Sequence, residues 1–253
     1  MINKIANLNI YNEGMRKSME DKLFFLPLVD DDKVKAIVDY GCADGTLLSL
    51  IPNKWEKIGI DMNIDMLTRA EELCQGGKFI LANNLPLIDG EGKILNLSSV
   101  LHEIYSYGTK DDVLVFWKNL FNSNYDYIVI RDLITDVSND KKAELSDILR
   151  IKNHPIYSKL VASFENKWGS INYQKNLLHF LLKYRYVENW DREVNENYFN
   201  LSVNELLNII PRQYEVFYKK TYCLPFVQKR IEKDFDILVE DTTHIQLILK
   251  KVN

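Results

Sequence analysis

Short apolar runs alternate with amphipathic stretches between residues 34 and 132, and this alternation predicts strands and helices in turn. Apolar runs bounded by turn residues indicate strands buried on both faces, whereas apolar residues three and four apart indicate helices packed on a sheet. Strands are expected at residues 34–40, 57–62, 78–82, 93–98 and 125–130, and helices at 46–51, 63–73 and 111–121. The order of elements predicts an α/β fold with a mainly parallel sheet and helices on both faces.

The rest of the chain departs from this rhythm. Residues 12–26 carry a helical apolar pattern and are expected to cover the sheet, as part of an N-terminal helical cover over residues 1–33. Residues 133–213 are helical in pattern and longer than one crossover requires, so we interpret them as a helical insert or lid. Two β-rich runs at residues 214–222 and 243–250 predict a closing antiparallel hairpin, which assigns residues 34–132 and 214–253 to one sheet domain.

The connection between the third and fourth predicted strands is short. Residues 83–92 are rich in glycine and proline, and they are too few for a long crossover helix. We therefore expect a short helical turn in this connection.

Composition indicates an ordinary globular protein. Of the 253 residues, 46% are hydrophobic and 27% are charged, and no apolar run approaches the roughly 20 residues that a membrane span needs. The first 28 residues lack the continuous apolar core of a signal peptide, so we expect a cytoplasmic protein without a membrane contact. Cys42, Cys74 and Cys223 are widely separated and odd in number, which favours free thiols over disulfides or a cysteine-rich metal site.

A net charge of −4 does not indicate nucleic-acid binding, because phosphate recognition usually leaves a basic surface. Two local stretches keep that alternative open. Residues 183–186 and 219–233 interleave lysines and arginines with aromatic residues, as an RNA groove would. Solvated strand and helix faces explain the same pattern, and we favour that interpretation.

The most informative stretch is Ile37–Thr46, followed by Ile58–Asp61. An apolar strand ends in Asp39, and small residues follow it, so backbone N–H groups can approach a ligand at the start of the next helix. Asp39, Gly41 and Gly45 match the pattern of an acidic residue followed by glycines at alternate positions, with Ala43 in place of the middle glycine. This stretch resembles the S-adenosylmethionine site of class I methyltransferases.

A dinucleotide-binding loop is the competing interpretation. That fingerprint requires G-x-G-x-x-G, and this chain has Ala43 and Thr46 where the second and third glycines would stand. An NAD-dependent oxidoreductase is therefore disfavoured.

The resemblance implies a Rossmann-like class I methyltransferase fold with a seven-stranded sheet, and S-adenosyl-L-methionine as cofactor. It implies that Asp61 accepts hydrogen bonds from both ribose hydroxyls and that Asn83 or Asn84 meets the adenine amino group. The full set of expected cofactor-binding residues is Asp39, Gly41, Cys42, Ala43, Gly45, Asp61, Met62, Asn83, Asn84, Ser98 and Ser99.

The segment after the fourth strand, residues 96–108, is dense in polar groups and is expected to lie beside the reacting methyl group. His102 can take a proton from an acceptor, and Glu103 can orient an amine or hydroxyl. Packing of the helix, or contact with the cofactor, explains these two residues as well. His102 and Glu103 begin like the H-E-x-x-H zinc motif, but position 106 is serine, so no metal is expected.

Arg131 and Asp132 follow the fifth strand. They are expected either to grip an acceptor with a carboxylate, phosphate or polar base, or to form an internal ion pair. The sequence thus predicts an S-adenosylmethionine-dependent methyltransferase acting on an oxygen or nitrogen acceptor, with a small-molecule acceptor favoured over RNA or protein. The rival from another class is a catalytically silent cofactor-binding module that acts through partners.

Overall fold

The computed structural model describes residues 18–29 and 32–252. The chain divides into two compact units. Within the described residues, the sheet unit comprises 18–29, 32–132, 208–220 and 245–252, and the helical unit comprises 133–207 and 221–244. Every residue predicted to bind the cofactor or act in catalysis belongs to the sheet unit.

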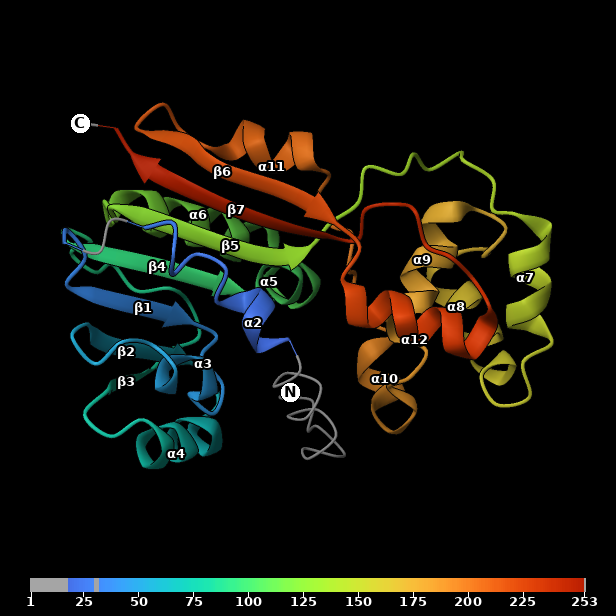
Figure 1. The fold of residues 1–253 in the computed structure, drawn as a ribbon, viewed down its shortest axis with the longest axis horizontal. Coiled ribbons are helices and arrows are strands. Elements are labelled where there is room, and N and C mark those ends of the chain that lie inside the picture. Colours follow the sequence, from blue (N-terminus) through green and yellow to red (C-terminus); the bar gives the residue numbers. More distant parts are fainter. Residues whose placement is uncertain (1–17, 30–31, 253) are drawn as a thin grey trace. The chain divides into compact units, whose positions relative to one another are not determined.

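Seven strands form one sheet in the order β3-β2-β1-β4-β5-β7-β6. The strands are β1 (Ala36–Tyr40), β2 (Glu56–Asp61), β3 (Lys78–Leu81), β4 (Lys93–Ser98), β5 (Tyr127–Leu133), β6 (Tyr214–Tyr222) and β7 (His244–Lys251). Strands β1 to β5 pair in parallel, whereas β7 runs antiparallel (Figure 1). The structure confirms the predicted seven-stranded, mainly parallel sheet.

Both faces of the sheet carry apolar side chains because alternate residues of a buried strand point to opposite sides. On β1, Ile37 joins a core cluster with Phe25 from the segment after α2 and Leu48 of α3. Tyr40 packs against Phe116 of α6, with ring centroids 5.7 Å apart. The helices of this unit are α2 (Met19–Lys22), α3 (Thr46–Ser49), α4 (Ile64–Leu73), α5 (Leu101–Tyr107) and α6 (Lys110–Asn122).

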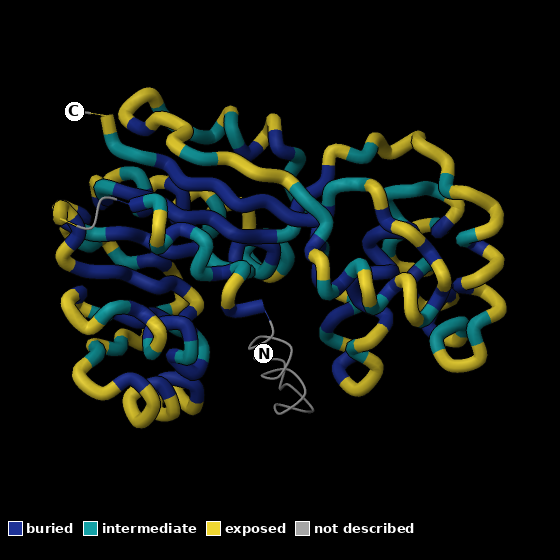
Figure 2. The backbone as a smooth tube through the Cα atoms, in the orientation of Figure 1, coloured by how far each residue is buried: buried dark blue, intermediate teal, exposed yellow. Residues whose placement is uncertain are grey.

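The centre of the sheet is buried and its two edge strands are not (Figure 2). All five residues of β1 are buried, whereas most residues of β3 and β6 are exposed. Parallel strands in the middle of a sheet place their carboxyl ends side by side, so the loops that follow β1, β2, β4 and β5 lie along one edge. This edge positions the candidate site.

The helical unit has its own hydrophobic core, which includes Phe164, Phe180 and Leu181. Its helices are α7 (Leu145–Lys152), α8 (Val161–Trp168), α9 (Gln174–Lys183), α10 (Trp190–Glu193) and α12 (Pro225–Phe235), while α11 (Val203–Ile209) spans the division between the units. Two short 3-10 helices lie at Ser158–Leu160 and Val187–Asn189. Across the described ranges, no helix combines the length and apolar character needed to cross a membrane.

Three details of the predicted elements differ from the structure. Residues 82–92 contain no helix: this segment is an irregular loop with a hydrogen-bonded turn before β4, and Asn119 and Ser123 at the end of α6 bind its backbone at Leu85, Ile88 and Gly90. The two last strands do not form a hairpin with a simple turn, since α12 lies between them. The N-terminal helix is α2 followed by turns, and residues 12–17 of the predicted helix lie outside the described residues.

The basic stretch at residues 183–186 does not form an RNA groove. Lys183 and Tyr184 are fully buried, and Arg185 pairs with Asp234. The ammonium group of Lys183 donates to the backbone carbonyl of Glu196 at 2.6 Å and lies 3.6 Å from the Tyr198 ring centre. The favoured interpretation as a solvated face is therefore also wrong for Lys183 and Tyr184, which lie in the interior of the helical unit.

Candidate functional site

The loop after β1 turns sharply through three residues in the left-handed region: Gly41 (φ 76°), Ala43 (φ 46°) and Gly45 (φ 73°). A Cβ at position 41 would stand 2.8 Å from a methyl group of Val100, and one at position 45 would stand 2.9 Å from Cβ of Ala70. Both glycines are therefore required by backbone conformation and by close packing. The loop leads directly into α3, whose N-cap is Gly45.

Asp61 at the end of β2 holds this loop. Its Oδ2 accepts a hydrogen bond from the backbone N–H of Ala43 at 2.9 Å, and its Oδ1 accepts one from the N–H of Asn63 at 2.9 Å. Burial raises the pKa of Asp61, and the backbone donors partly offset that rise. Asp61 thus joins the loops after β1 and β2, and its carboxylate keeps hydrogen-bonding capacity for a ligand beside its backbone donors.

Apolar side chains flank Asp61 at the surface. Met62 is 53% exposed. Leu81 of β3, the register partner of Asp61, is 55% exposed. Exposed apolar side chains next to a partly buried carboxylate suit a ligand that has a flat ring and a hydroxylated sugar. Asn83 and Asn84, the predicted adenine contacts, follow β3 and are exposed.

Asp39 lies inside the sheet. Its Oδ1 accepts a hydrogen bond from the Nδ2 of Asn96 on β4 at 2.7 Å, and the two residues are partners in the strand register. Burial raises the pKa of Asp39 to about 7, against the opposing effects of the Asn96 hydrogen bond and of Lys22. Lys22 on α2 is itself buried, and burial together with the Arg131 charge lowers its pKa to about 8. Asp39 therefore makes its hydrogen bond within the sheet and belongs to the buried part of the candidate site.

Asp132 and His102 form a buried pair at the ends of β5 and α5. Nδ1 of His102 lies 2.7 Å from Oδ1 of Asp132. The other oxygen, Oδ2, accepts from the backbone N–H groups of Val100 and Leu101 at 2.9 and 2.7 Å. Two such donors favour the ionised carboxylate, and an ionised Asp132 favours the His102 tautomer that carries its proton on Nδ1.

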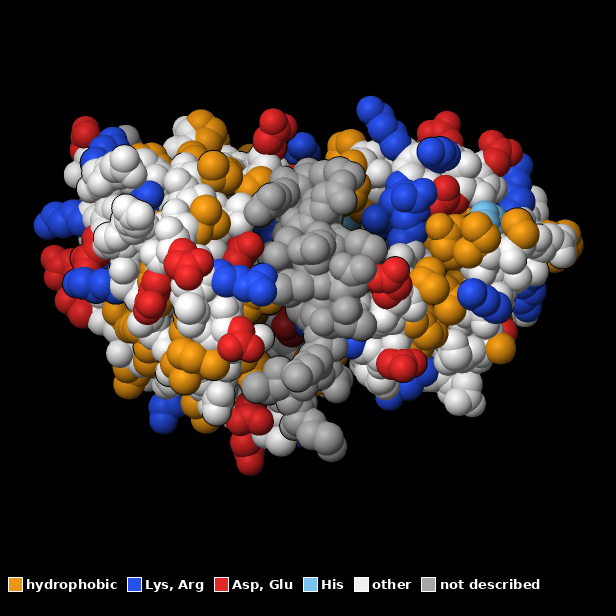
Figure 3. All heavy atoms as spheres, turned by 90° about the horizontal axis from the view of Figure 1, so that it is seen from below, with side chains coloured by type: hydrophobic (Ala, Val, Ile, Leu, Met, Phe, Trp, Pro, Cys, Tyr) orange, Lys and Arg blue, Asp and Glu red, His pale blue; other side chains and the backbone are white. Residues whose placement is uncertain are grey.

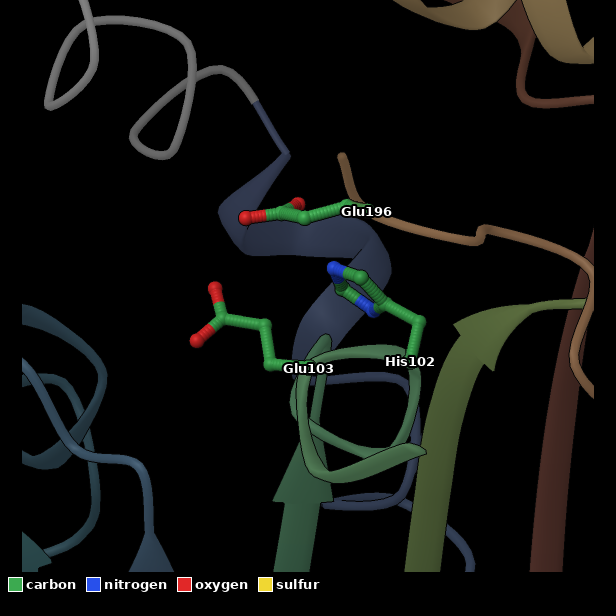
Figure 4. A group of neighbouring side chains, drawn as sticks. All are labelled: His102, Glu103 and Glu196. Atoms are coloured by element: carbon green, nitrogen blue, oxygen red, sulfur yellow. The ribbon is translucent and has the colours of Figure 1, made fainter. Parts of the chain in front are cut away.

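The neighbouring residues of α5 extend the polar surface. A carboxylate oxygen of Glu103 and a ring nitrogen of His102 lie within 4.8 Å of each other. Figure 4 shows both side chains leaving α5 toward the same side. The hydroxyl of Tyr105, one turn further, accepts a hydrogen bond from the indole N–H of Trp117 at 2.9 Å. His102 and Glu103 therefore offer a proton acceptor and a carboxylate side by side.

Arg131 has internal partners. Its Nε donates to Oδ2 of Asp21 at 2.6 Å, and its Nη1 donates to the hydroxyl of Ser99 at 2.9 Å. Asp132 is likewise engaged with His102 and the backbone. Of the two expected roles, the internal ion pair is the closer description for Arg131, but its partner is Asp21 rather than Asp132. Asp132 is held by His102 and the backbone, whereas Nη2 of Arg131 has no hydrogen-bond partner in the described structure, so a role in gripping an acceptor stays a prediction for Arg131.

Some buried polar atoms in this region have no hydrogen-bond partner in the described structure. They are Oδ1 of Asn96, Oγ of Ser98 and Nη2 of Arg131, all near the carboxyl ends of β4 and β5. Buried polar atoms are normally satisfied, and unsatisfied ones mark positions for a ligand or water. They lie at the same edge of the sheet as Asp61 and the loop at 41–45.

Asp21 and Lys22 are absent from the predicted site, and Asn96 belongs to the predicted polar segment 96–108 without an assigned role. Asn96 was detectable, because it is a polar residue between the apolar Leu95 and Leu97 of a buried strand. Asp21 and Lys22 carried no signal. They stand on a short amphipathic stretch whose charges are typical of a solvated helix face.

No protein-family model and no curated protein matches the sequence. Solved structures with a similar fold do match. An S-adenosylmethionine-dependent methyltransferase from Mesorhizobium loti shares 15% identity, covering 94% of this chain and 100% of that chain, with a TM-score of 0.55. One from Methanosarcina mazei shares 14% identity, covering 90% and 97%, with a TM-score of 0.51. The MccD protein shares 10% identity, covering 95% and 98%, with a TM-score of 0.51.

At these identities the likeness concerns the fold. The strand order with an antiparallel β7 is typical of that fold. The loop after β1 and the acidic residue at the end of β2 occupy the positions at which open α/β sheets bind their ligands. The chain has the fold of the class I S-adenosylmethionine-dependent methyltransferases.

Proposed function

We propose that this protein binds S-adenosyl-L-methionine and transfers its methyl group to an oxygen or nitrogen atom of a small molecule. The observation that carries the proposal is that two hydrogen-bonded pairs of residues lie on one edge of the sheet. The first is the Asp61–Ala43 hydrogen bond that shapes the loop after β1. The second is the Asp132–His102 pair at the ends of β5 and α5.

The residues present fit this cofactor. Asp61 has lone pairs for the ribose hydroxyls, and exposed Met62 and Leu81 offer apolar contact to a base. Gly41 lets the loop pack closely against Val100, where a Cβ would clash, and keeps its backbone in the left-handed conformation. When bound, the cofactor supplies a methyl group on a positive sulfonium, which is electrophilic without help from a metal.

The acidic groups near the loop suit that positive charge. Asp39, Asp44 and Asp61 lie on or beside the loop after β1, and all three are buried or partly buried. A low local dielectric strengthens the attraction between a carboxylate and a cation. In their ionised form these carboxylates would favour the sulfonium of the cofactor over the neutral thioether of its demethylated product.

The acceptor also loses one proton in this reaction, and a group of the protein has to accept it. A hydroxyl has to lose its proton as its oxygen attacks the methyl carbon, and a protonated amine has to lose one before its nitrogen can attack. His102 is suited to accept it at Nε2, because Asp132 fixes the Nδ1–H tautomer and stabilises the positive imidazolium that forms. Glu103 is suited to orient the acceptor through a hydrogen bond to its donor group.

An RNA or protein acceptor is the alternative substrate class. On the face drawn in Figure 3, the described acidic and basic side chains are interspersed rather than segregated. Extended phosphate recognition relies on a concentrated basic surface. Lys183 and Tyr184 are buried, which removes one of the two basic stretches that kept an RNA acceptor open. A small-molecule acceptor is therefore the better-supported proposal.

Isothermal titration with S-adenosylmethionine and S-adenosylhomocysteine tests the proposal, with NAD as a control ligand. We expect micromolar binding of both adenosyl compounds, a loss of at least 100-fold in Asp61→Ala, and no binding of NAD. Absence of binding to either adenosyl compound contradicts the proposal. If binding is confirmed, methyl transfer to a panel of hydroxyl and amine acceptors tests the reaction itself, and cofactor binding without any transfer would favour a silent binding module.

A further inference from the structure

The segment Ser99–His102 joins β4 to α5 and carries the proposed base. Ser99 adopts a left-handed conformation with φ 59°, which is unfavourable for a residue with a Cβ and persists only where its surroundings hold it. Val100, the next residue, lies against Gly41 of the cofactor loop, where only glycine leaves room for it. The conformation of this segment therefore affects both the base and the loop.

Two consecutive residues of β5 hold the whole segment. The carbonyl of Arg131 accepts the backbone N–H of Ser99 at 2.7 Å, and its guanidinium donates to the Ser99 hydroxyl at 2.9 Å. Asp132 binds the three following residues through the N–H of Val100, the N–H of Leu101 and the imidazole of His102. Each residue from 99 to 102 is thus bound to position 131 or position 132.

Asp21 connects this arrangement to α2. Its Oδ2 accepts from Nε of Arg131 at 2.6 Å, and both its Oδ1 and its backbone carbonyl accept from the Nε2 of Gln246 on β7 at 3.0 Å. The side chain of Arg131 is 4% exposed and that of Asp21 is 17% exposed, so solvent screens the ion pair little. Without Asp21, a buried guanidinium would lose its charge partner and would have to move.

We infer that Asp21 is a positioning residue, which through Arg131 holds the Ser99–His102 segment in the conformation required for methyl transfer. The inference rests on the proposed function for its kinetic consequence, but its structural basis does not depend on activity. It also assigns α2 a role beyond covering the sheet. His102 is then correctly placed only when Asp21 holds α2 against Arg131.

The experiment compares Asp21→Ala and Asp21→Asn with the unchanged protein and with Glu56→Ala as a matched control. Glu56 pairs with Lys78 at the exposed edge of the same sheet, so its loss removes an ion pair away from the site. Asparagine at position 21 keeps an oxygen that can accept from Arg131 but loses the charge. It serves as the milder variant if alanine prevents folding.

The first readout is NMR-detected hydrogen exchange, which requires no substrate. In Asp21→Ala we expect the amides of Ser99, Val100 and Leu101 to exchange at least tenfold faster, while the amides of β1 keep their rates. Asp21→Asn should show a smaller increase, and Glu56→Ala none. Unchanged exchange at residues 99–101 in both Asp21 variants overturns the inference whether or not the protein transfers methyl groups.

The second readout separates positioning from cofactor binding. We expect kcat for methyl transfer to fall at least tenfold in Asp21→Ala, with the Kd for S-adenosylmethionine within threefold of the unchanged value. A variant that loses cofactor affinity and retains kcat contradicts the inference. Failure of the proposed function is recognised separately, because the unchanged protein would then show no transfer while the exchange result still decides the role of Asp21.

Discussion

Asp132 contacts His102 through one carboxylate oxygen and the first N–H groups of α5 through the other. A single side chain therefore caps the helix and fixes the tautomer of the histidine that the helix carries. This dual contact explains why Asp132 is 2% exposed and has no orientation that would suit an external acceptor.

The first prediction concerns this pair. Asp132→Asn keeps one oxygen for the N–H groups of Val100 and Leu101, which leaves its amide N–H₂ facing His102. The amide would donate to Nδ1, so the proton would move to Nε2 and the imidazole could no longer accept one there. We expect kcat for methyl transfer to fall by about 100-fold, with the cofactor Kd within threefold.

Steady-state kinetics and calorimetry on the same preparation check this expectation. Asp112→Asn is a suitable control, because Asp112 caps α6 at the surface through Thr109 and lies outside the site. Equal activity of Asp132→Asn and the unchanged protein would mean that His102 is not the base.

The second prediction concerns Ala43, the departure from the glycine pattern. Its φ of 46° is strained for a residue with a Cβ, at a cost of roughly 1 kcal/mol. Ala43→Gly relieves this strain but also increases the entropy of the unfolded chain. We expect the free energy of unfolding to rise by a few tenths to about 1 kcal/mol, and the cofactor Kd to stay equal or decrease.

Asn124→Gly is the matched control, since Asn124 has a similar φ of 56° in a loop outside the site and asparagine tolerates that conformation better than alanine. Urea unfolding of both variants makes the comparison. A loss of stability in Ala43→Gly larger than in Asn124→Gly would show that the Ala43 methyl group contributes packing that outweighs the strain.

Much of this site followed from local sequence patterns. The loop at 41–45 and Asp61 were predictable because glycine requirements and strand ends leave short-range signals. The strand and helix order from 34 to 132 was predictable because parallel buried strands are continuous apolar runs. Even the position of His102 after β4 was correct.

The partners of the charged residues were not predictable. Asp21 and Arg131 are 110 positions apart, and His102 and Asp132 are 30 apart, so only the folded sheet decides which charges meet. Helix α12 was missed because the two β-rich runs around it suggested a hairpin. The irregular connection at residues 82–92 was also missed, since part of its backbone is bound by Asn119 and Ser123 at the end of α6, which are distant in sequence.

The third prediction concerns the apolar surface beside Asp61. Met62→Ala and Leu81→Ala should each weaken S-adenosylmethionine binding by about 1 kcal/mol, or roughly fivefold, if a base covers these side chains. Thermal stability should barely change, because both side chains are more than half exposed in the unliganded protein.

Leu114→Ala serves as the control, since Leu114 on α6 is 67% exposed and lies apart from the predicted cofactor residues. Calorimetric titration of the three variants measures the effect. Identical affinities in all three would place the base elsewhere on the sheet edge.

The last prediction concerns pH and Asp39. Burial raises the pKa of Asp39 in the folded protein to about 7, from an ordinary value of 3.8. The folded protein then binds this proton more tightly than the unfolded chain does. Stability therefore declines as pH rises from about 4 to about 7 and the folded protein comes to hold a buried charge.

Asp39→Asn removes this titration while its amide oxygen can still accept from Asn96, and Lys22 retains Asp132 and Asp21 as nearby opposite charges. We expect the variant to be more stable than the unchanged protein at pH 8, by about 1–3 kcal/mol, with the difference shrinking toward pH 5. Chemical unfolding at both pH values measures this. A gain that is equal at pH 5 and pH 8 would show that Asp39 stays ionised across the range and that Lys22 neutralises it, which would make the Asp39–Lys22 contact a second anchor of α2.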